Sequence, residues 1–185
     1  MQLTGDRFTS VSALFGNDLS TFPDFPAEIR APAGTVNGVS SFQVHISDHD
    51  ITTPGDVPDV LVAMNPAALK ADLHRLDQHG LLIINSDAFE ERGLQKAGYD
   101  TNPLLDESLA QYRVVEIPMT SLTQLATEPL GVKSRDSERS KNFFALGVIS
   151  WLYSRPIEPT VKWVESRFKD LVKESNLAAF RAGYN

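Results

Sequence analysis

The sequence predicts an α/β fold of the Rossmann-like type, an open and mostly parallel sheet with helices on both faces, followed by a helical C-terminal third. Short apolar runs at 58–65, 81–87 and 112–118 alternate with helical segments. That order is typical of parallel strands covered by helices. From about residue 120 onward the apolar positions follow helical rather than strand spacing.

The composition narrows the class of protein. The chain has 185 residues, of which 42% are hydrophobic, enough for one domain with a sizeable core. It has no cysteine, which rules out disulfides and thiolate metal sites and is compatible with the cytoplasmic location that we expect. A net charge of -7 without a dense Lys/Arg cluster argues against nucleic acid as a partner. No membrane association is expected, because the most apolar run, 143–153, is far shorter than the roughly 20 residues of a membrane span.

The first quarter of the chain predicts a helix, a turn and extended segments. Residues 2–15 carry apolar side chains at helical spacing, so a helix begins almost at the first residue. The segment GNDLS, 16–20, predicts a turn. Three prolines within 21–32 predict extended backbone, because each disfavours helix in the residue before it. SFQVHIS, 41–47, alternates strictly between apolar and polar residues and predicts a half-covered strand.

Helices are predicted between and after the three apolar runs. In 66–80, Pro66 marks a helix start and Gly80 a helix stop. Residues 138–153 are apolar almost all round, which predicts a buried helix. Pro159 begins a single final helix.

The chain begins inside a helix, whereas doubly wound α/β folds open with a strand and a glycine-rich turn that leads into the first helix. We therefore expect the first strand and its glycine-rich turn to be missing. On this interpretation residues 1–185 form a single domain that is truncated at both ends.

FPAEIRAPAGT, 25–35, places a carboxylate and a guanidinium on one face of an extended segment. Glu28 can orient Arg30 toward the carboxylate or phosphate of a partner. Gly34 and Thr35 follow in a run of small residues that leaves room for close approach. The alternative is a surface ion pair that contributes about 0–1 kcal/mol.

Polar residues follow the three predicted parallel strands, at the edge where ligands bind in open α/β sheets. They are Asn65, then Asn85, Ser86 and Asp87, then Thr120 and Ser121. The alternative interpretation is that these residues are ordinary helix caps. HISDHD, 45–50, superficially resembles a metal site, but alternating side chains on a strand do not converge, so no metal is expected.

Lys141 and Asn142 stand where ERSKNFFALG, 138–147, changes from charged to apolar. A helix could present both side chains to a phosphate or to a partner domain, or the change could simply mark the start of an amphipathic helix. The sequence contains no GxSxG, P-loop or HExxH motif, and we expect no catalytic residue in this chain.

Several long segments resemble one family. They are MQLTGDRFT, FPAEIRAPAGTVNGVSSFQVHI, TPGDVPDVLVAMNPAALK, KAGYDTNPL and RSKNFFALGVISWLYSRP. Together they look like the gamma domain, in the N-terminal part of the alpha subunit of 2-oxoglutarate (2-oxoacid):ferredoxin oxidoreductases. Similar proteins carry a GDSGDG-like turn before MQLTG and continue into a thiamin-pyrimidine domain after AGYN.

The resemblance implies CoA-dependent oxidative decarboxylation of a 2-oxoacid, with electrons passed to ferredoxin. Thiamin diphosphate, Mg and the iron–sulfur cluster are then expected on partner domains, with CoA as cosubstrate and no cofactor bound by this chain alone. The expected partners are the remaining alpha-subunit domains, the beta subunit that binds thiamin pyrophosphate, and ferredoxin.

The resemblance also gives the candidates for contact with CoA or with a neighbouring domain. They are Glu28, Arg30, Gly34, Thr35, Asn65, Lys141 and Asn142. The domain is expected to cover the active site without being catalytic itself. An alternative is a free-standing CoA- or nucleotide-binding module of the same fold. The missing glycine-rich turn argues against that alternative, because this turn usually cradles the phosphates.

Overall fold

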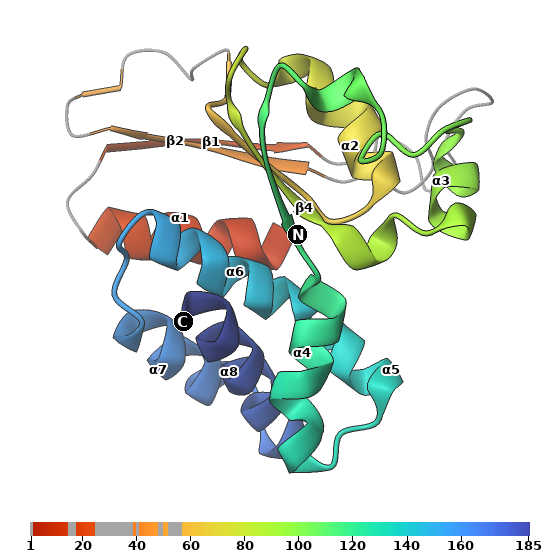
Figure 1. Ribbon diagram of the computed structural model, residues 1–185. Coiled ribbons are helices and arrows are strands. Elements are labelled where there is room, and N and C mark those ends of the chain that lie inside the picture. Colours follow the sequence, from red (N-terminus) through yellow and green to blue (C-terminus); the bar gives the residue numbers. More distant parts are fainter. Residues whose placement is uncertain (1, 15–17, 25–38, 40, 48–49, 52–56) are drawn as a thin grey trace. The chain divides into compact units, whose positions relative to one another are not determined.

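The computed structural model describes the chain except for residues 1, 15–17, 25–38, 40, 48–49 and 52–56 (Figure 1). The chain divides into two compact units. The first, which we call the helical unit, contains residues 1–22, 44–54 and 119–185. The second, the sheet unit, contains residues 23–43 and 55–118.

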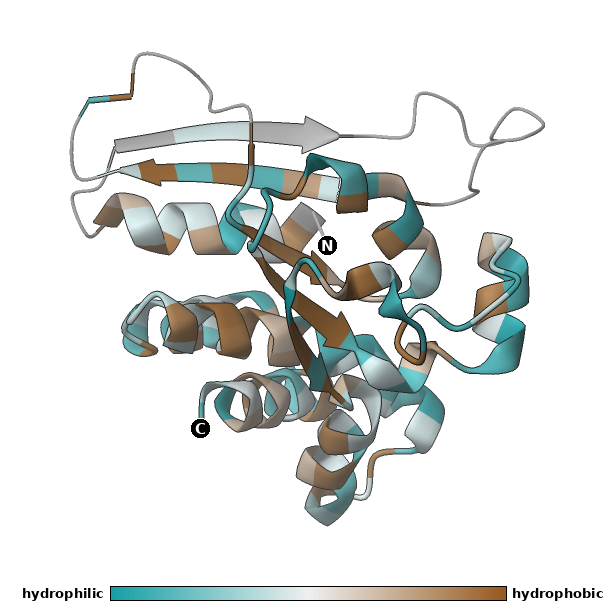
Figure 2. Cartoon of the chain, turned by 45° about the horizontal axis from the view of Figure 1, so that its top comes forward, coloured by the Kyte–Doolittle hydropathy of each residue, from teal (hydrophilic) through white to brown (hydrophobic). Residues whose placement is uncertain are grey.

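The sheet unit is built on three parallel strands in the order β3-β4-β5. These are β3 (Val60–Ala63), β4 (Leu81–Asn85) and β5 (Arg113–Ile117). In the central strand, Leu82 pairs with Leu61 on one side and with Val114 on the other. Figure 2 shows β3 and β4 as strongly apolar segments. The predicted α/β class and the parallel sheet are confirmed.

Short helices link the strands of the sheet unit. They are α2 (Pro66–Asp72), η1 (Leu73–Arg75), η2 (Ser86–Ala88), α3 (Glu91–Ala97) and η3 (Glu107–Leu109). One face of the sheet packs with these helices into a continuous core around Leu69, Leu82 and Ile84, each fully buried. Ile83 and Asn85 on the opposite face are buried as well. Burial on both faces explains why β4 is apolar without alternation.

A second sheet pairs β1 (Asp18–Asp24) with β2 (Ser41–Ser47). The turn predicted at 16–20 is wrong from residue 18 onward, because strand pairing overrides the turn preference of Asp and Ser there. β2 is a strand as predicted, but its side chains do not alternate in exposure: residues 41–46 are all half-buried. On the predicted polar face, Gln43 accepts a hydrogen bond from Arg75, as described below.

The helical unit gathers the remaining helices of the described chain. They are α1 (Gln2–Leu14), α4 (Met119–Thr127), η4 (Glu128–Leu130), α5 (Ser134–Ser137), η5 (Glu138–Ser140), α6 (Lys141–Leu152), α7 (Glu158–Arg167) and α8 (Asp170–Tyr184). The buried helix predicted at 138–153 is α6, which buries Phe144 and Leu146. No helix among the described residues is long and apolar enough to cross a membrane.

Helices α6 and α8 pack unusually close together, because glycines face each other's backbone. A Cβ at Gly147 would collide with the carbonyl oxygen of Phe180, and a Cβ at Gly183 would collide with that of Phe144. Glycine at these two positions therefore sets the distance between the helices.

The helix predicted to end at Gly80 is shorter than expected. α2 ends at Asp72 and η1 ends at Arg75, after which a turn leads into β4. Gly80 belongs to that turn: an added Cβ would lie 2.8 Å from Cδ1 of Leu76 and 2.9 Å from the carbonyl oxygen of Asp77. The glycine is required by this close approach and not by a helix C-cap.

The single final helix predicted from Pro159 is also wrong, because it is two helices. The backbone is extended at Phe168 and has a positive φ of 48° at Asp170. The break turns the Phe168 ring edge-on to two aromatic rings, 5.6 Å from that of Phe143 and 5.9 Å from that of Trp163, between ring centroids. Tertiary aromatic packing thus interrupts a continuous helical pattern.

Candidate functional site

The carboxyl ends of β3 and β4 carry two asparagines with different roles. Asn65 is the N-cap of α2, where its Oδ1 accepts a hydrogen bond from the backbone N–H of Ala68 at 2.8 Å. Asn85 is fully buried and donates from Nδ2 to the carbonyl oxygen of Met64 at 3.3 Å. The capping alternative therefore holds for Asn65, while Asn85 ties the ends of neighbouring strands together.

The sheet brings together only part of the predicted strand-end set. Ser86 and Asp87 follow Asn85 in η2 and are half-exposed. Thr120 and Ser121 follow β5, but they lie in α4, in the helical unit. The edge of the sheet unit thus offers amide, hydroxyl and carboxylate groups suited to hydrogen-bonding a ligand.

Lys141 and Asn142 form the start of α6, as predicted from the change in polarity. Both are half-buried, and the carbonyl oxygen of Asn142 accepts a hydrogen bond from Oγ1 of Thr4 at 3.4 Å. Within the described residues, no carboxylate forms an ion pair with Lys141. An ammonium without a carboxylate partner is available to a phosphate or to an acidic group of another molecule.

Glu28, Arg30, Gly34 and Thr35 lie outside the residues that the structure describes. Their grouping with Asn65, Lys141 and Asn142 stays a prediction. Asn65 belongs to the sheet unit, whereas Lys141 and Asn142 belong to the helical unit.

A loop between α3 and β5 is held rigid by the side chain of Asp106. This carboxylate accepts hydrogen bonds from the backbone N–H of Ser108 at 2.9 Å and from Oγ1 of Thr101 at 2.9 Å, and it also contacts the Ser108 hydroxyl. These bonds, those from Ser108 first, hold the pKa of Asp106 below its ordinary value because they favour the charged form. The same loop exposes Leu105.

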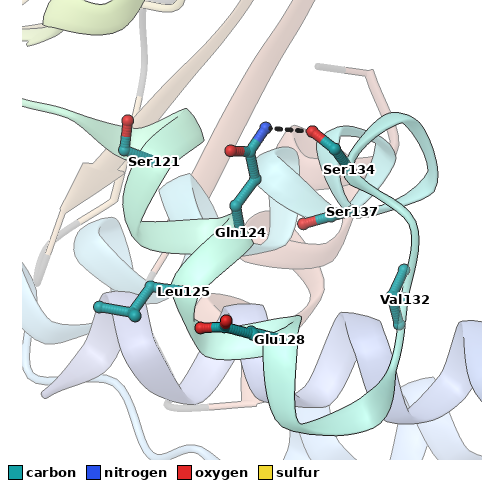
Figure 3. Close-up of a pocket in the computed structure, with 7 residues that line it drawn as sticks. All are labelled: Ser121, Gln124, Leu125, Glu128, Val132, Ser134 and Ser137. Carbon is teal, nitrogen blue, oxygen red and sulfur yellow. Dashed lines mark hydrogen bonds between the residues drawn. The ribbon is translucent and has the colours of Figure 1, made fainter.

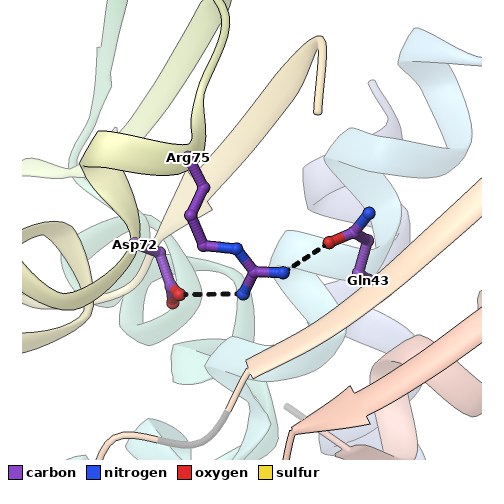
Figure 4. A network of polar contacts seen from close by, with 3 residues as sticks. All are labelled: Gln43, Asp72 and Arg75. Atoms are coloured by element: carbon purple, nitrogen blue, oxygen red, sulfur yellow. Dashed lines mark hydrogen bonds and ion pairs between the residues drawn. The ribbon is translucent and has the colours of Figure 1, made fainter. Parts of the chain in front are cut away.

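Arg75, the last residue of η1, forms a hydrogen bond with Gln43 of β2 (Figure 4). Its Nη2 donates to Oε1 of Gln43 at 2.7 Å, and its Nη1 lies 3.4 Å from Oδ1 of Asp72. The three side chains converge from segments distant in sequence, as the close-up shows.

A shallow pocket of about 410 Å³ lies beside α4 in the helical unit (Figure 3). Its lining residues are Ser121, Gln124, Leu125, Glu128, Val132, Ser134 and Ser137. Gln124 donates to Oγ of Ser134 at 2.9 Å, and Ser137 is held by a 2.7 Å hydroxyl contact with Thr127. With one carboxylate and no base positioned against a hydroxyl, this pocket offers polar contacts rather than a nucleophile.

Metal binding has no support in the described part of the chain, where no three His, Cys, Asp or Glu residues lie together. The residues that sequence reasoning missed are Arg75 and Gln43, which only the fold brings together, and Arg7. The signal for Arg7 was available, because a charged residue stands among the apolar positions of the first helix.

The comparisons with known proteins agree with this fold. The family model for pyruvate ferredoxin/flavodoxin oxidoreductase matches residues 1–185. The 2-oxoglutarate oxidoreductase subunit KorA of Mycobacterium tuberculosis (strain ATCC 25618 / H37Rv) is 55% identical over the whole chain. The chain spans 29% of the length of that relative.

Solved structures give the same picture. A 2-oxoglutarate:ferredoxin oxidoreductase from Magnetococcus marinus, with 2-oxoglutarate, coenzyme A and succinyl-CoA bound, matches with a TM-score of 0.71 and 26% identity over 97% of this chain and 27% of that one.

Two separate subunits share the fold at lower identity. The keto/oxoacid ferredoxin oxidoreductase gamma subunit of Geobacter sulfurreducens matches with a TM-score of 0.63 and 20% identity, over 98% of this chain and 88% of that one. The pyruvate oxidoreductase subunit PORC of Thermotoga maritima gives a TM-score of 0.60 and 19% identity, over 98% of this chain and 86% of that one. With the family model matching from end to end, the chain belongs to the pyruvate ferredoxin/flavodoxin oxidoreductase family.

Proposed function

We propose that this chain is the gamma-type domain of a 2-oxoacid:ferredoxin oxidoreductase whose substrate is 2-oxoglutarate. The observation that carries the proposal is 55% identity, over every residue of the chain, with a 2-oxoglutarate oxidoreductase subunit. The structural match to an enzyme with 2-oxoglutarate and succinyl-CoA bound supports the same substrate class.

In the proposed reaction the bond between the carboxylate carbon and the keto carbon of the 2-oxoacid breaks and CO2 leaves. The acyl group forms a thioester with CoA, and the released electron pair reaches ferredoxin. Thiamin diphosphate would supply the carbanion stabilisation, and an iron–sulfur cluster the path for electrons. This chain has no cysteine, so thiolate ligands for such a cluster have to come from another part of the enzyme.

Within that enzyme, this domain would cover the active site and contact CoA. Lys141 supports the contact, since its ammonium is half-buried and has no ion-pair partner among the described residues. Asn142 beside it, Asn65 at the sheet edge, and Arg30 oriented by Glu28 would add donors, with Gly34 and Thr35 leaving space. The remaining alpha-subunit domains, a subunit that binds thiamin diphosphate, and ferredoxin complete the proposed assembly.

Affinity purification of the native polypeptide tests this function. We expect copurification with a subunit that binds thiamin diphosphate, and reduction of ferredoxin that requires both 2-oxoglutarate and CoA. In that complex, Arg30→Ala should raise the KM for CoA or lower turnover. Copurification with no such subunit, together with CoA binding by the 185 residues alone in calorimetry, would instead establish a free-standing binding module.

A further inference from the structure

Arg7 is a buried cation that forms no ion pair with a carboxylate of the described residues. It projects from the buried face of α1, is only 9% exposed, and lies with its Cζ 5.5 Å from the centre of the Trp163 ring. Its Nε has no hydrogen-bond acceptor, and no carboxylate forms an ion pair with it anywhere in the described chain. Burial lowers the pKa of Arg7, and the neighbouring Asp6 offsets part of that effect.

This arrangement is unfavourable as it stands. A guanidinium taken out of water loses its hydration, and stacking on an indole recovers only part of that loss. Asp6 directly precedes Arg7 in the helix, and adjacent helical residues do not face each other, so the two side chains are not placed to pair. The five donors of a guanidinium match the two oxygens of a carboxylate in a planar, bidentate pair.

The C-terminal end of α6, which packs against α1, exposes aromatic side chains. Phe8, next to Arg7, packs its ring 5.6 Å from that of Tyr153, which is 39% exposed. Trp151, two residues earlier at the end of α6, is 61% exposed. Arginine, tryptophan and tyrosine are the residues most enriched where protein interfaces concentrate their binding energy.

We propose that Arg7 and Trp163 form a docking site for a protein segment that inserts an Asp or Glu carboxylate beside the Trp163 ring. A carboxylate matches this site because its two oxygens pair with the guanidinium fork, whose Nε has no acceptor among the described residues. A docking segment gains affinity from its other contacts and needs only one acidic group at Arg7. The partner inferred here is another domain or subunit of the oxidoreductase, so this step rests on the proposed function.

The substitution Arg7→Met distinguishes a docking role from a purely structural role. The two roles predict opposite effects on the Tm of the isolated chain and on subunit affinity. In the isolated chain, methionine removes an unpaired buried charge, so Tm should stay within about 2 °C of the original or rise. In the purified complex, the same change leaves the partner's carboxylate unpaired, and the subunit dissociation constant should rise more than about tenfold. Arg139→Met, at an exposed ion pair with Asp136, is the matched control and should change neither value.

The opposite pair of results would overturn the proposal: a clear loss of Tm in the isolated chain with unchanged assembly. Unchanged assembly alone would overturn it as well. If the wild-type polypeptide fails to assemble with any oxidoreductase subunit, the proposed function fails first, and the Tm of Arg7→Met still reports on the unpaired charge.

A titration with small anions tests whether Arg7 prefers a carboxylate or a phosphate. Trp151→Phe leaves Trp163 as the single tryptophan, since the chain has two, so its fluorescence reports on Arg7 directly. We expect acetate to perturb Trp163 only weakly and inorganic phosphate not to saturate the signal at millimolar concentration. Saturation by phosphate that is lost in Arg7→Met would show a phosphate site and contradict the assignment to a protein carboxylate.

Discussion

Asn65 has an observed structural role, and its role in binding a ligand stays a prediction. Its amide oxygen already caps α2 through the N–H of Ala68, and its position at the end of β3 is where α/β proteins bind ligands. The two roles make different demands. Capping requires a short side chain with an oxygen, whereas a ligand contact through the amide also requires the N–H2 group.

Substitutions at Asn65 should separate these demands. Asn65→Ala should lower the free energy of unfolding by about 0.5–2 kcal/mol, because the N–H of Ala68 loses its partner. Asn65→Ser should keep most of that stability, because a hydroxyl oxygen caps equally well. Urea unfolding checks both values. If Asn65→Ser matches the original in stability but raises the KM for CoA in the purified complex, the amide contacts the ligand.

Asp106 should make the free energy of unfolding depend on pH, with a loss of stability in acid. Hydrogen bonds from Ser108 and Thr101 lower its folded pKa, so the stability it contributes is fully present above its ordinary pKa and is lost as pH falls through the lowered value. NMR titration of the Asp106 carboxyl should give a midpoint below that of an unperturbed aspartate. Asp106→Asn should remove this part of the acid dependence. A midpoint at or above the ordinary value would contradict the hydrogen-bonded loop.

At the scale of elements, the crossing of α6 and α8 depends on two glycines. Gly147→Ala or Gly183→Ala would press a methyl group against the backbone of the opposite helix, with no flexible side chain to move aside. Overpacking of this kind should lower the free energy of unfolding by about 1–3 kcal/mol, although alanine is the better helix former. Chemical denaturation measures the effect. Lys162→Ala on exposed α7 is the control, and stabilisation by either glycine change would show that the helices can separate at little cost.

The elements also show where sequence reasoning succeeds and where it stops. β3, β4 and β5 were predicted from apolar runs, and the central strand β4 lacks alternation because it is buried on both faces. The edge strand β5 is largely exposed. Gly80 was misread as a helix stop, because only the approach of Leu76 and Asp77 reveals its reason. The break after α7 was missed because the packing of the Phe168 ring overrides a local helical pattern.

The candidate site was predictable only in part. Asn65 and Lys141 could be named as candidates because strand ends and abrupt changes of polarity are visible in the sequence, and their contact with a ligand stays a prediction. Arg75 and Gln43 could not be paired in advance, since they are 32 positions apart and meet only in the folded sheet unit. Arg7 was overlooked for a different reason: the first helix was predicted from its apolar positions alone, and the charged residue among them was not considered.

For the whole molecule, the family and the fold agree, and the proposed chemistry depends on an assembly larger than this chain. Because this chain has no cysteine, it supplies no thiolate ligand for an iron–sulfur cluster of the proposed enzyme. The Arg7 docking site and the half-buried Lys141 are consistent with a part whose electrostatic partners lie on other polypeptide segments.

The most direct test is the initial rate of ferredoxin reduction by the natively purified complex, measured with 2-oxoglutarate, pyruvate and 2-ketoisovalerate, each with and without CoA. The proposal predicts the highest kcat/KM with 2-oxoglutarate, formation of succinyl-CoA, and loss of sustained turnover when CoA is omitted. A complex that reduces ferredoxin with none of the three acids would contradict the central claim. A complex that prefers pyruvate would leave the family intact and refute the assigned substrate.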